Sequence, residues 1–110
     1  MPPGGEEAAR AFYGGVLGLD EVPKPAPMMA NGGAWFRSGG VELHLGAEPD
    51  FEPARKAHPA LRVDDIDKLA ARCEAAGHAA QWDGRYPGMR RFYVHDPFGN
   101  RIEILQPDRS

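Results

Sequence analysis

Three short segments of the chain alternate apolar residues with ionisable ones, the pattern of a β-strand with one face in a core. They are residues 40–45 (GVELHL), 58–63 (HPALRV) and 100–105 (NRIEIL). Successive side chains of a strand point to opposite faces, so the apolar residues are expected on the core face. The residues expected on the opposite face are Glu42, His44, His58, Arg62 and Glu103. Two carboxylates and one or two imidazoles outside the core form a ligand set that suits a divalent metal.

Two segments show helical spacing of apolar residues. Residues 6–17 follow a pair of glycines, carry acidic residues in the first turn and end at Gly18. Residues 65–76 have Asp64 or Asp65 as N-cap and are closed by Gly77. We predict a helix over each segment.

The remaining elements are shorter. Strands are predicted at 19–22 and 79–82, and hairpins pair 34–37 with 41–45 and 90–95 with 101–106. The proline-rich segment 23–33 is predicted to be a loop, and 47–57 a linker. Phe36, Phe92 and Val94 are expected in the core. The residues expected on the face opposite the core are Trp35, Arg37, Arg91, Tyr93 and His95.

The two halves of the chain have the same order of predicted elements, a helix followed by three strands. The last strand of each half contains a Val-Glu-Leu or Ile-Glu-Ile triplet, which makes Glu42 and Glu103 equivalent. The second half has a further strand before its helix, and nothing precedes Glu6 that corresponds to it. We therefore expect a single domain over 1–110, with modules at about 1–50 and about 56–110 and a strand absent at the front.

Composition limits the classes of partner. With 110 residues and 42% hydrophobic residues the chain is long enough for a core, and Cys73 alone allows no internal disulfide. Its formal net charge is −3 and no run of Lys or Arg exceeds two, so neither nucleic acid nor an anionic membrane is expected as partner. The expected partner is a small molecule. No signal peptide or long apolar run is visible, so a cytoplasmic protein is expected.

Three segments resemble motifs of one known superfamily. They are residues 11–19 (AFYGGVLGL), 58–65 (HPALRVDD) and 92–105 (FYVHDPFGNRIEIL). They are similar to segments of the vicinal oxygen chelate superfamily, which includes glyoxalases, bleomycin resistance proteins and extradiol dioxygenases. The resemblance implies an α+β fold of paired βαβββ modules. Their eight strands would form a curved, cup-shaped mixed sheet with helices on its outer face, here without the first strand.

The same resemblance implies metal ligands on the inner face of the cup. His58 and Glu103 match ligands of the second module, and Glu42 matches the carboxylate that glyoxalase-like members use in the first module. The remaining ligand of such members comes from the first strand, which this chain does not contain. Either the natural chain begins upstream or the protein works without that ligand, unless His44 replaces it. The ligand types admit Ni, Zn, Mn, Fe or Co.

A metal in such a cup would chelate two neighbouring substrate oxygens and stabilise an enolate, while a glutamate moves the proton. Glu42 is our first candidate for this role and Glu103 our second. Trp35, Arg37, Arg91 and Tyr93 are the candidate substrate-binding residues. The alternatives are that the glutamates and His58 only form ion pairs with arginines of the same face, and that the aromatic rings pack between modules or across a dimer.

The predicted function is a metal-dependent lyase or isomerase of glyoxalase type, acting on a small cytoplasmic metabolite such as the thiol adduct of a 2-oxoaldehyde. The alternative is a non-catalytic protein of bleomycin-resistance type that binds a planar or cationic drug. Two further activities of the superfamily fit this sequence less well. They are thiol transfer to an epoxide antibiotic and extradiol dioxygenation. A homodimer is expected, because a missing first strand would leave a sheet edge for a second chain to cover.

Overall fold

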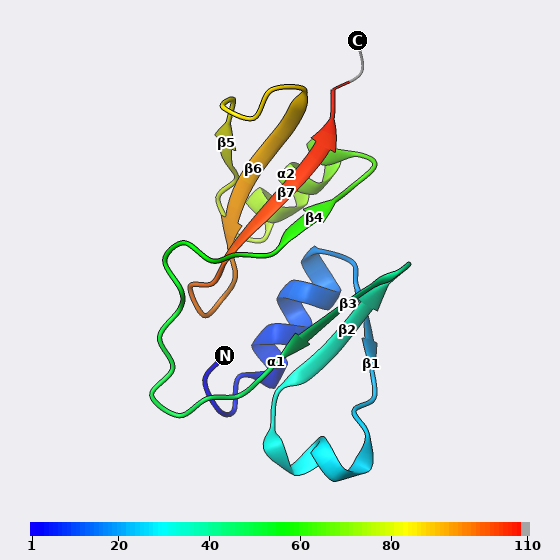
Figure 1. The fold of residues 1–110 in the computed structure, drawn as a ribbon, viewed down its shortest axis with the longest axis vertical. Helices are drawn as coiled ribbons and strands as arrows, with labels where there is room; N and C mark the ends of the chain where they lie inside the picture. The colour runs from blue at the N-terminus through cyan, green and yellow to red at the C-terminus, as the bar shows by residue number, and fades with distance from the viewer. Residues whose placement is uncertain (109–110) are drawn as a thin grey trace. The chain divides into compact units, whose positions relative to one another are not determined.

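The structure, a computed structural model, describes residues 1–108. The chain divides into two compact units, Met1–Pro53 and Ala54–Ser110 (Figure 1). Each unit combines helix with β-sheet, and each is described by itself below. The division falls within the segment predicted to be a linker, residues 47–57.

The first unit begins with a helix of mixed geometry. A short α-helix, α1 (Glu6–Ala9), continues directly into a π-helix, η1 (Arg10–Val16). The wider turn is visible in the bond from the Leu17 amide to the Phe12 carbonyl, 2.9 Å long. Gly14 and Gly15 lie in this stretch and place no side chain against the wider turns. The prediction of a helix over 6–17 is therefore confirmed in extent, but not as regular α-helix.

The sheet of the first unit contains β1 (Asp20–Val22), β2 (Ala34–Ser38) and β3 (Val41–Leu45), antiparallel and in that order. Within the predicted loop 23–33 the chain forms a 3-10 helix, η2 (Ala26–Asn31). Phe36 is fully buried, as predicted. Val41, predicted to face the core, is 49% exposed, because it opens an outer strand next to the hairpin turn.

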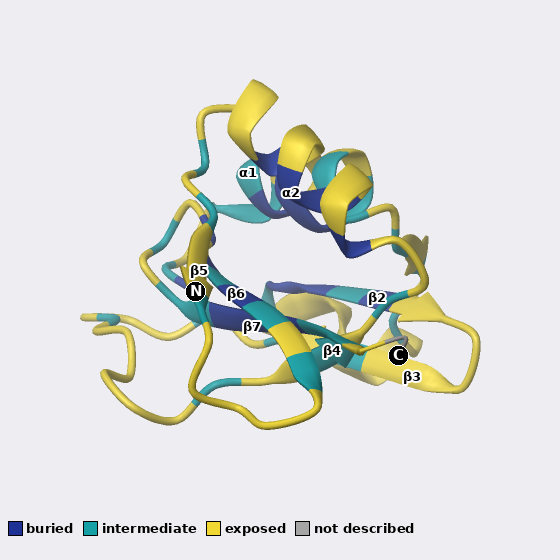
Figure 2. Cartoon of the chain, turned by 90° about the horizontal axis from the view of Figure 1, so that it is seen from above, coloured by how far each residue is buried: buried dark blue, intermediate teal, exposed yellow. Residues whose placement is uncertain are grey.

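The second unit contains β4 (Ala60–Arg62), α2 (Ile66–Ala75), β5 (Gln81–Asp83), β6 (Met89–His95) and β7 (Arg101–Pro107). The strand order is β4-β7-β6-β5, with β4 parallel to β7 and the other pairs antiparallel. Helix α2 packs over β6 and β7, and the buried residues lie between them (Figure 2). This core is formed by Ile66, Leu69, Cys73, Phe92, Val94, Ile102 and Ile104.

Helix α2 begins as the sequence predicts. The carboxylate of Asp65 accepts a hydrogen bond from the Lys68 amide at 3.1 Å, which makes Asp65 the N-cap. Gln106 adds a second connection, since its side chain accepts from the Ile66 amide and donates to the Asp64 carbonyl. The start of the helix is thus fixed to β7.

The strand predicted at 58–63 is shorter in the structure and begins at Ala60. Pro59 has no amide hydrogen and cannot continue the donor side of the ladder, although its carbonyl accepts from the Glu103 amide at 3.0 Å. His58 consequently precedes β4 instead of lying within it. Its ring nevertheless reaches β7, as described below.

The α+β class is confirmed, with one three-stranded and one four-stranded sheet over residues 1–108. The cup-shaped sheet and the absence of a first strand stay predictions. Among the described residues, no helix is long and apolar enough to span a membrane.

Candidate functional site

A buried carboxylate lies at the centre of the second sheet. Glu103 is only 5% exposed, in the middle of β7 between Ala60 of β4 and Tyr93 of β6. Ile102 and Ile104 on either side of it point into the core, so the Glu103 side chain lies on the opposite face of the sheet. We call this face of the second unit the open face. A carboxylate removed from water in this way needs partners with positive charge or hydrogen-bond donors.

Two side chains supply those partners. The Nε2 atom of His58 lies 2.8 Å from one carboxylate oxygen of Glu103, and Nη1 of Arg91 donates to the other at 3.3 Å. Arg91 also lies 3.6 Å from Asp83, measured between a guanidinium nitrogen and a carboxylate oxygen. Burial disfavours the charged form of Arg91, but its hydrogen bond to Glu103 and the neighbouring Tyr93 and Asp83 outweigh this, so the pKa of Arg91 is raised.

The other nitrogen of the His58 ring decides what Nε2 can do. Nδ1 lies 2.7 Å from the Lys56 carbonyl and 3.1 Å from Nη2 of Arg101. If Nδ1 carries the proton it donates to Lys56, and Nε2 then faces Glu103 with a lone pair unless a proton or a metal cation lies between them. If Arg101 donates to Nδ1 instead, the proton is on Nε2 and is donated to Glu103. Because an ionised carboxylate only accepts hydrogen bonds, the 2.8 Å contact requires a proton or a metal cation at Nε2, and a cation there with the proton on Nδ1 is the arrangement typical of metal-binding histidines.

Tyr93 brings the arginines of the open face together. The guanidinium carbons of Arg101 and Arg91 lie 4.7 and 5.1 Å from the centre of its ring. The His58 ring meets the same tyrosine edge-on, with ring centres 5.5 Å apart. Of the predicted site residues, the structure therefore brings together His58, Glu103, Arg91 and Tyr93 on the second unit.

Asp83 closes one end of this group. It accepts hydrogen bonds from the side chain and the backbone of Arg85, with the shortest contact 2.6 Å. These bonds, together with the nearby charges of Arg85 and Arg91, hold the pKa of Asp83 well below its usual range. Asp83 is thus an ionised partner for the arginines at the edge of the sheet.

The predicted site residues of the first unit form a separate group on its sheet. The rings of Trp35 and His44 stack with centres 3.7 Å apart and planes 5° from parallel. His44 Nε2 lies 3.3 Å from a Glu42 carboxylate oxygen, and both side chains are about half exposed. Arg37 is opposite Glu42 in the strand register. This group offers a flat aromatic surface beside a carboxylate.

Two members of the open face were missed in the sequence. Arg101 lies two residues before Glu103 on the same strand, and strand alternation alone places both on one face. That signal was therefore available. Asp83 had no such signal, because the strand carrying it was predicted to end one residue earlier.

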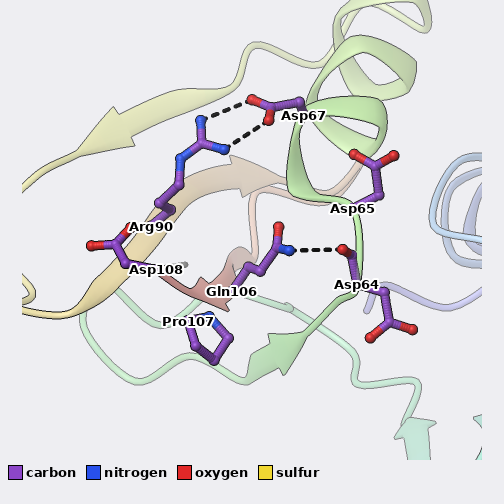
Figure 3. Close-up of a pocket in the computed structure, with 7 residues that line it drawn as sticks. All are labelled: Asp64, Asp65, Asp67, Arg90, Gln106, Pro107 and Asp108. Carbon is purple, nitrogen blue, oxygen red and sulfur yellow. Dashed lines mark hydrogen bonds and ion pairs between the residues drawn. The ribbon is translucent and has the colours of Figure 1, made fainter. Parts of the chain in front are cut away.

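An acidic hollow of about 480 Å³ lies elsewhere on the second unit (Figure 3). It is lined by Asp64, Asp65, Asp67, Arg90, Gln106, Pro107 and Asp108. Two of its side chains connect the helix to the strands: Arg90 holds Asp67 through two bonds of 2.7 and 2.8 Å, and Gln106 binds the start of α2. These contacts attach the helix to the sheet, and we do not place the functional site there.

Comparison with known proteins agrees with this fold. The family model of the glyoxalase/bleomycin resistance protein/dioxygenase superfamily matches residues 5–104. The chain belongs to this superfamily. No match was found among proteins with curated functions.

Several solved structures of this superfamily's fold resemble the chain. A glyoxalase family protein from Bacillus anthracis is 45% identical, with a TM-score of 0.94 over 98% of this chain and 88% of that one. An antibiotic binding protein from Streptomyces sp. CB03234 is 27% identical, with a TM-score of 0.73 over 98% and 91%. The lactoylglutathione lyase from Agrobacterium tumefaciens is 26% identical, with a TM-score of 0.71 over 96% and 88%. The neighbours thus include both an enzyme and a binding protein.

Members of the superfamily often bind metals, and His58 and Glu103 are donors of the types that such metals accept. The 2.8 Å between His58 Nε2 and Glu103 Oε1 is a hydrogen-bond distance, and two tetrahedral ligands of one ion with bonds of about 2.1 Å would lie roughly 3.4 Å apart. Over residues 1–108, however, no three His, Cys, Asp or Glu side chains form a group that could hold a metal. The pair supplies an imidazole and a carboxylate, donor types that a divalent metal accepts, without a third such side chain beside them among residues 1–108.

Proposed function

We propose that this glyoxalase-family protein converts a small metabolite on the open face of its second unit, with His58 and Glu103 as two ligands of a divalent metal. The observation that carries the proposal is the pairing of His58 Nε2 with the buried Glu103 carboxylate while Nδ1 is held by the Lys56 carbonyl. Glu42 stays the predicted third ligand. A bound divalent ion would supply Lewis-acid polarisation of two neighbouring substrate oxygens.

The residues of the chain have distinct roles in this proposal. The Lys56 carbonyl fixes the ring of His58, and Arg91 holds one oxygen of Glu103 and so orients the carboxylate. Glu42, or else Glu103, moves the substrate proton. Arg91 and Tyr93 bind the substrate, and Trp35 and Arg37 are proposed as further binding residues. The simplest reaction of this kind is isomerisation of the thiol adduct of a 2-oxoaldehyde to a thioester.

Calorimetry of chelator-stripped protein tests the metal site. Ni, Zn and Mn would be titrated into the wild type, His58→Ala and Glu103→Ala. We expect one tight site in the wild type and a loss of at least tenfold in affinity with either substitution, because each removes a ligand. His78→Ala is the matched control, since His78 binds the His95 carbonyl and not the pair, and should keep the site. Wild-type protein that binds none of the three metals would contradict the proposal.

Binding without turnover is the second candidate. It is favoured by the stacked pair of Trp35 and His44 beside the Glu42 carboxylate, a surface suited to a planar cationic ligand. The similarity to an antibiotic binding protein supports it as well. Titration with bleomycin would then change the tryptophan fluorescence stoichiometrically and Trp35→Leu would remove the change, while the hemithioacetal of methylglyoxal would not be converted. Conversion of that adduct would favour the first proposal.

A further inference from the structure

Arg101 is a half-buried cation that has no carboxylate partner among residues 1–108. Its Nη2 atom donates to the Lys56 carbonyl at 3.0 Å and contacts His58 Nδ1 at 3.1 Å, and neither partner is an anion. Its Nε atom is buried and has no hydrogen-bond partner in the described part of the chain. A guanidinium that has lost water in this way is stabilised by an anion, which these contacts do not supply.

Arg91 approaches the Tyr93 ring from one side, and Arg101 approaches it from the other end of the strand pair. In the ladder between β6 and β7, Arg101 is opposite His95 and Arg91 is opposite Leu105, with Tyr93 between the two positions. Arg91 has carboxylate neighbours, but its contacts to them are long, 3.3 Å to Glu103 and 3.6 Å to Asp83. Its Nε atom is likewise buried without a hydrogen-bond partner among the described residues. Both guanidinium groups therefore retain unused hydrogen-bonding capacity around one aromatic ring.

The neighbouring Arg90, in the same strand, has a carboxylate that accepts hydrogen bonds from both of its terminal nitrogens. It points to the other face of β6, where Asp67 accepts two bonds of 2.7 and 2.8 Å from it. Asp83, the other acid near the open face, makes its shortest contacts with Arg85. The described part of the chain thus provides a well-placed carboxylate for Arg90 and Arg85, but none for Arg101.

We propose that Arg101 and Arg91 bind an oxyanion of the ligand, a carboxylate, phosphonate or phosphate, with Tyr93 packing against the part of the ligand next to it. The guanidinium fork matches such oxyanions and binds them through paired hydrogen bonds. This inference rests on the proposed function in placing a small molecule on the open face, and it adds the chemical class of that molecule. It also assigns a binding role to Arg101.

Titration with two small anions tests this assignment. Phenylphosphonate and benzoate would be titrated by calorimetry into the full chain kept metal-free with chelator, and benzyl alcohol would serve as the neutral analogue. We expect at least one of the two anions to bind and the alcohol not to bind. Arg101→Gln should weaken anion binding at least tenfold. The stronger of the two anions would distinguish a phosphonate or phosphate ligand from a carboxylate. Arg90→Gln is the control and should change the affinity less than twofold.

Three results would overturn the proposal: neither anion binds the wild type, the alcohol binds equally well, or Arg101→Gln binds as tightly as the wild type. If Arg101→Gln does not fold, as judged by circular dichroism, Arg101→Lys decides, because it keeps the charge and loses the planar fork. Unchanged anion affinity in Arg101→Lys would then contradict the proposal, and weakened anion affinity would support it. Because the protein is metal-free, a failure here is distinguishable from a failure of the metal site.

Discussion

Glu103 combines two properties that a carboxylate seldom has, a position inside a β-ladder and a nearly complete loss of solvent. Its 5% exposure is tolerated because His58 and Arg91 each contact one of its oxygens. Removing one partner would leave the carboxylate buried and underbonded, which is costly. The same contacts that stabilise Glu103 also fix the direction of its oxygens, which is what a ligand or a general base requires.

Asp83 gives a prediction of pH-dependent stability at the residue scale. Hydrogen bonds from Arg85 hold its pKa below the usual value, so the ionised carboxylate stabilises the folded state above the unfolded pKa of about 3.9. This contribution is lost as the pH falls below that value. In urea unfolding we expect Asp83→Asn to be less stable than the wild type at pH 7, with the difference shrinking from about pH 4 downwards.

The exposed Asp20 supplies the control for that experiment. Asp20→Asn should unfold close to the wild type at pH 7, because Asp20 lies on an outer strand at the surface. A difference between Asp83→Asn and wild type that stayed constant down to pH 3 would show that packing, and not ionisation, explains the loss.

At the scale of elements, the start of β2 is held by a close backbone approach. Gly33 has φ +87°, and a Cβ built on it would lie 2.0 Å from the Leu45 carbonyl oxygen at the end of β3. Its amide donates to the Glu6 carboxylate of α1 at 2.9 Å, and this bond lowers the pKa of Glu6. One glycine therefore connects the helix, β2 and β3 of the first unit.

Substituting Gly33 should destabilise the first unit strongly. We expect Gly33→Ala to lose about 1–2 kcal/mol from the positive φ alone, and more because the methyl group collides with backbone that cannot move freely. Gly40→Ala is the matched control in the same sheet, since nothing lies within 4 Å of its added Cβ. Thermal unfolding followed by circular dichroism measures both. Equal midpoints for the two variants would refute the close approach.

At the scale of the whole molecule, the two units repeat one arrangement of three antiparallel strands behind a helix. Strands β1, β2 and β3 of the first unit correspond to β5, β6 and β7 of the second. In the second unit β4 adds a parallel strand beside β7. Within the described residues, β3 is the outer strand at the place that corresponds to β7. Its Val41 is half exposed, as expected for an edge that another strand or chain can cover.

The predicted homodimer is tested on this edge. We expect size-exclusion chromatography with light scattering to give twice the monomer mass of 12.0 kDa. Val41→Lys should shift the protein toward monomer, because a lysine on an edge strand disfavours edge contact. Val22→Lys, on β1 at the other edge of the same sheet, is the comparison and should keep the dimer. A wild-type monomer at all concentrations would exclude the dimer.

The sequence by itself determined the elements and the faces of their residues. Alternation in 100–105 and the acidic cap at Asp65 are local properties, encoded by neighbours within four positions, and they predicted β7 and α2 correctly. The same parity put Glu103 and Arg91 opposite the core. Local rules were less accurate for η1 and η2, where the backbone bonds depart from regular geometry.

Only the tertiary structure decided which of these residues meet. His58 and Glu103 are 45 positions apart, and their contact depends on the parallel pairing of β4 with β7. The burial of Glu103 and the convergence of Arg91 and Arg101 on Tyr93 depend on the same ladder. Strand alternation assigns a residue to a face, but the register between distant strands sets its neighbours, and that register comes from packing the whole core.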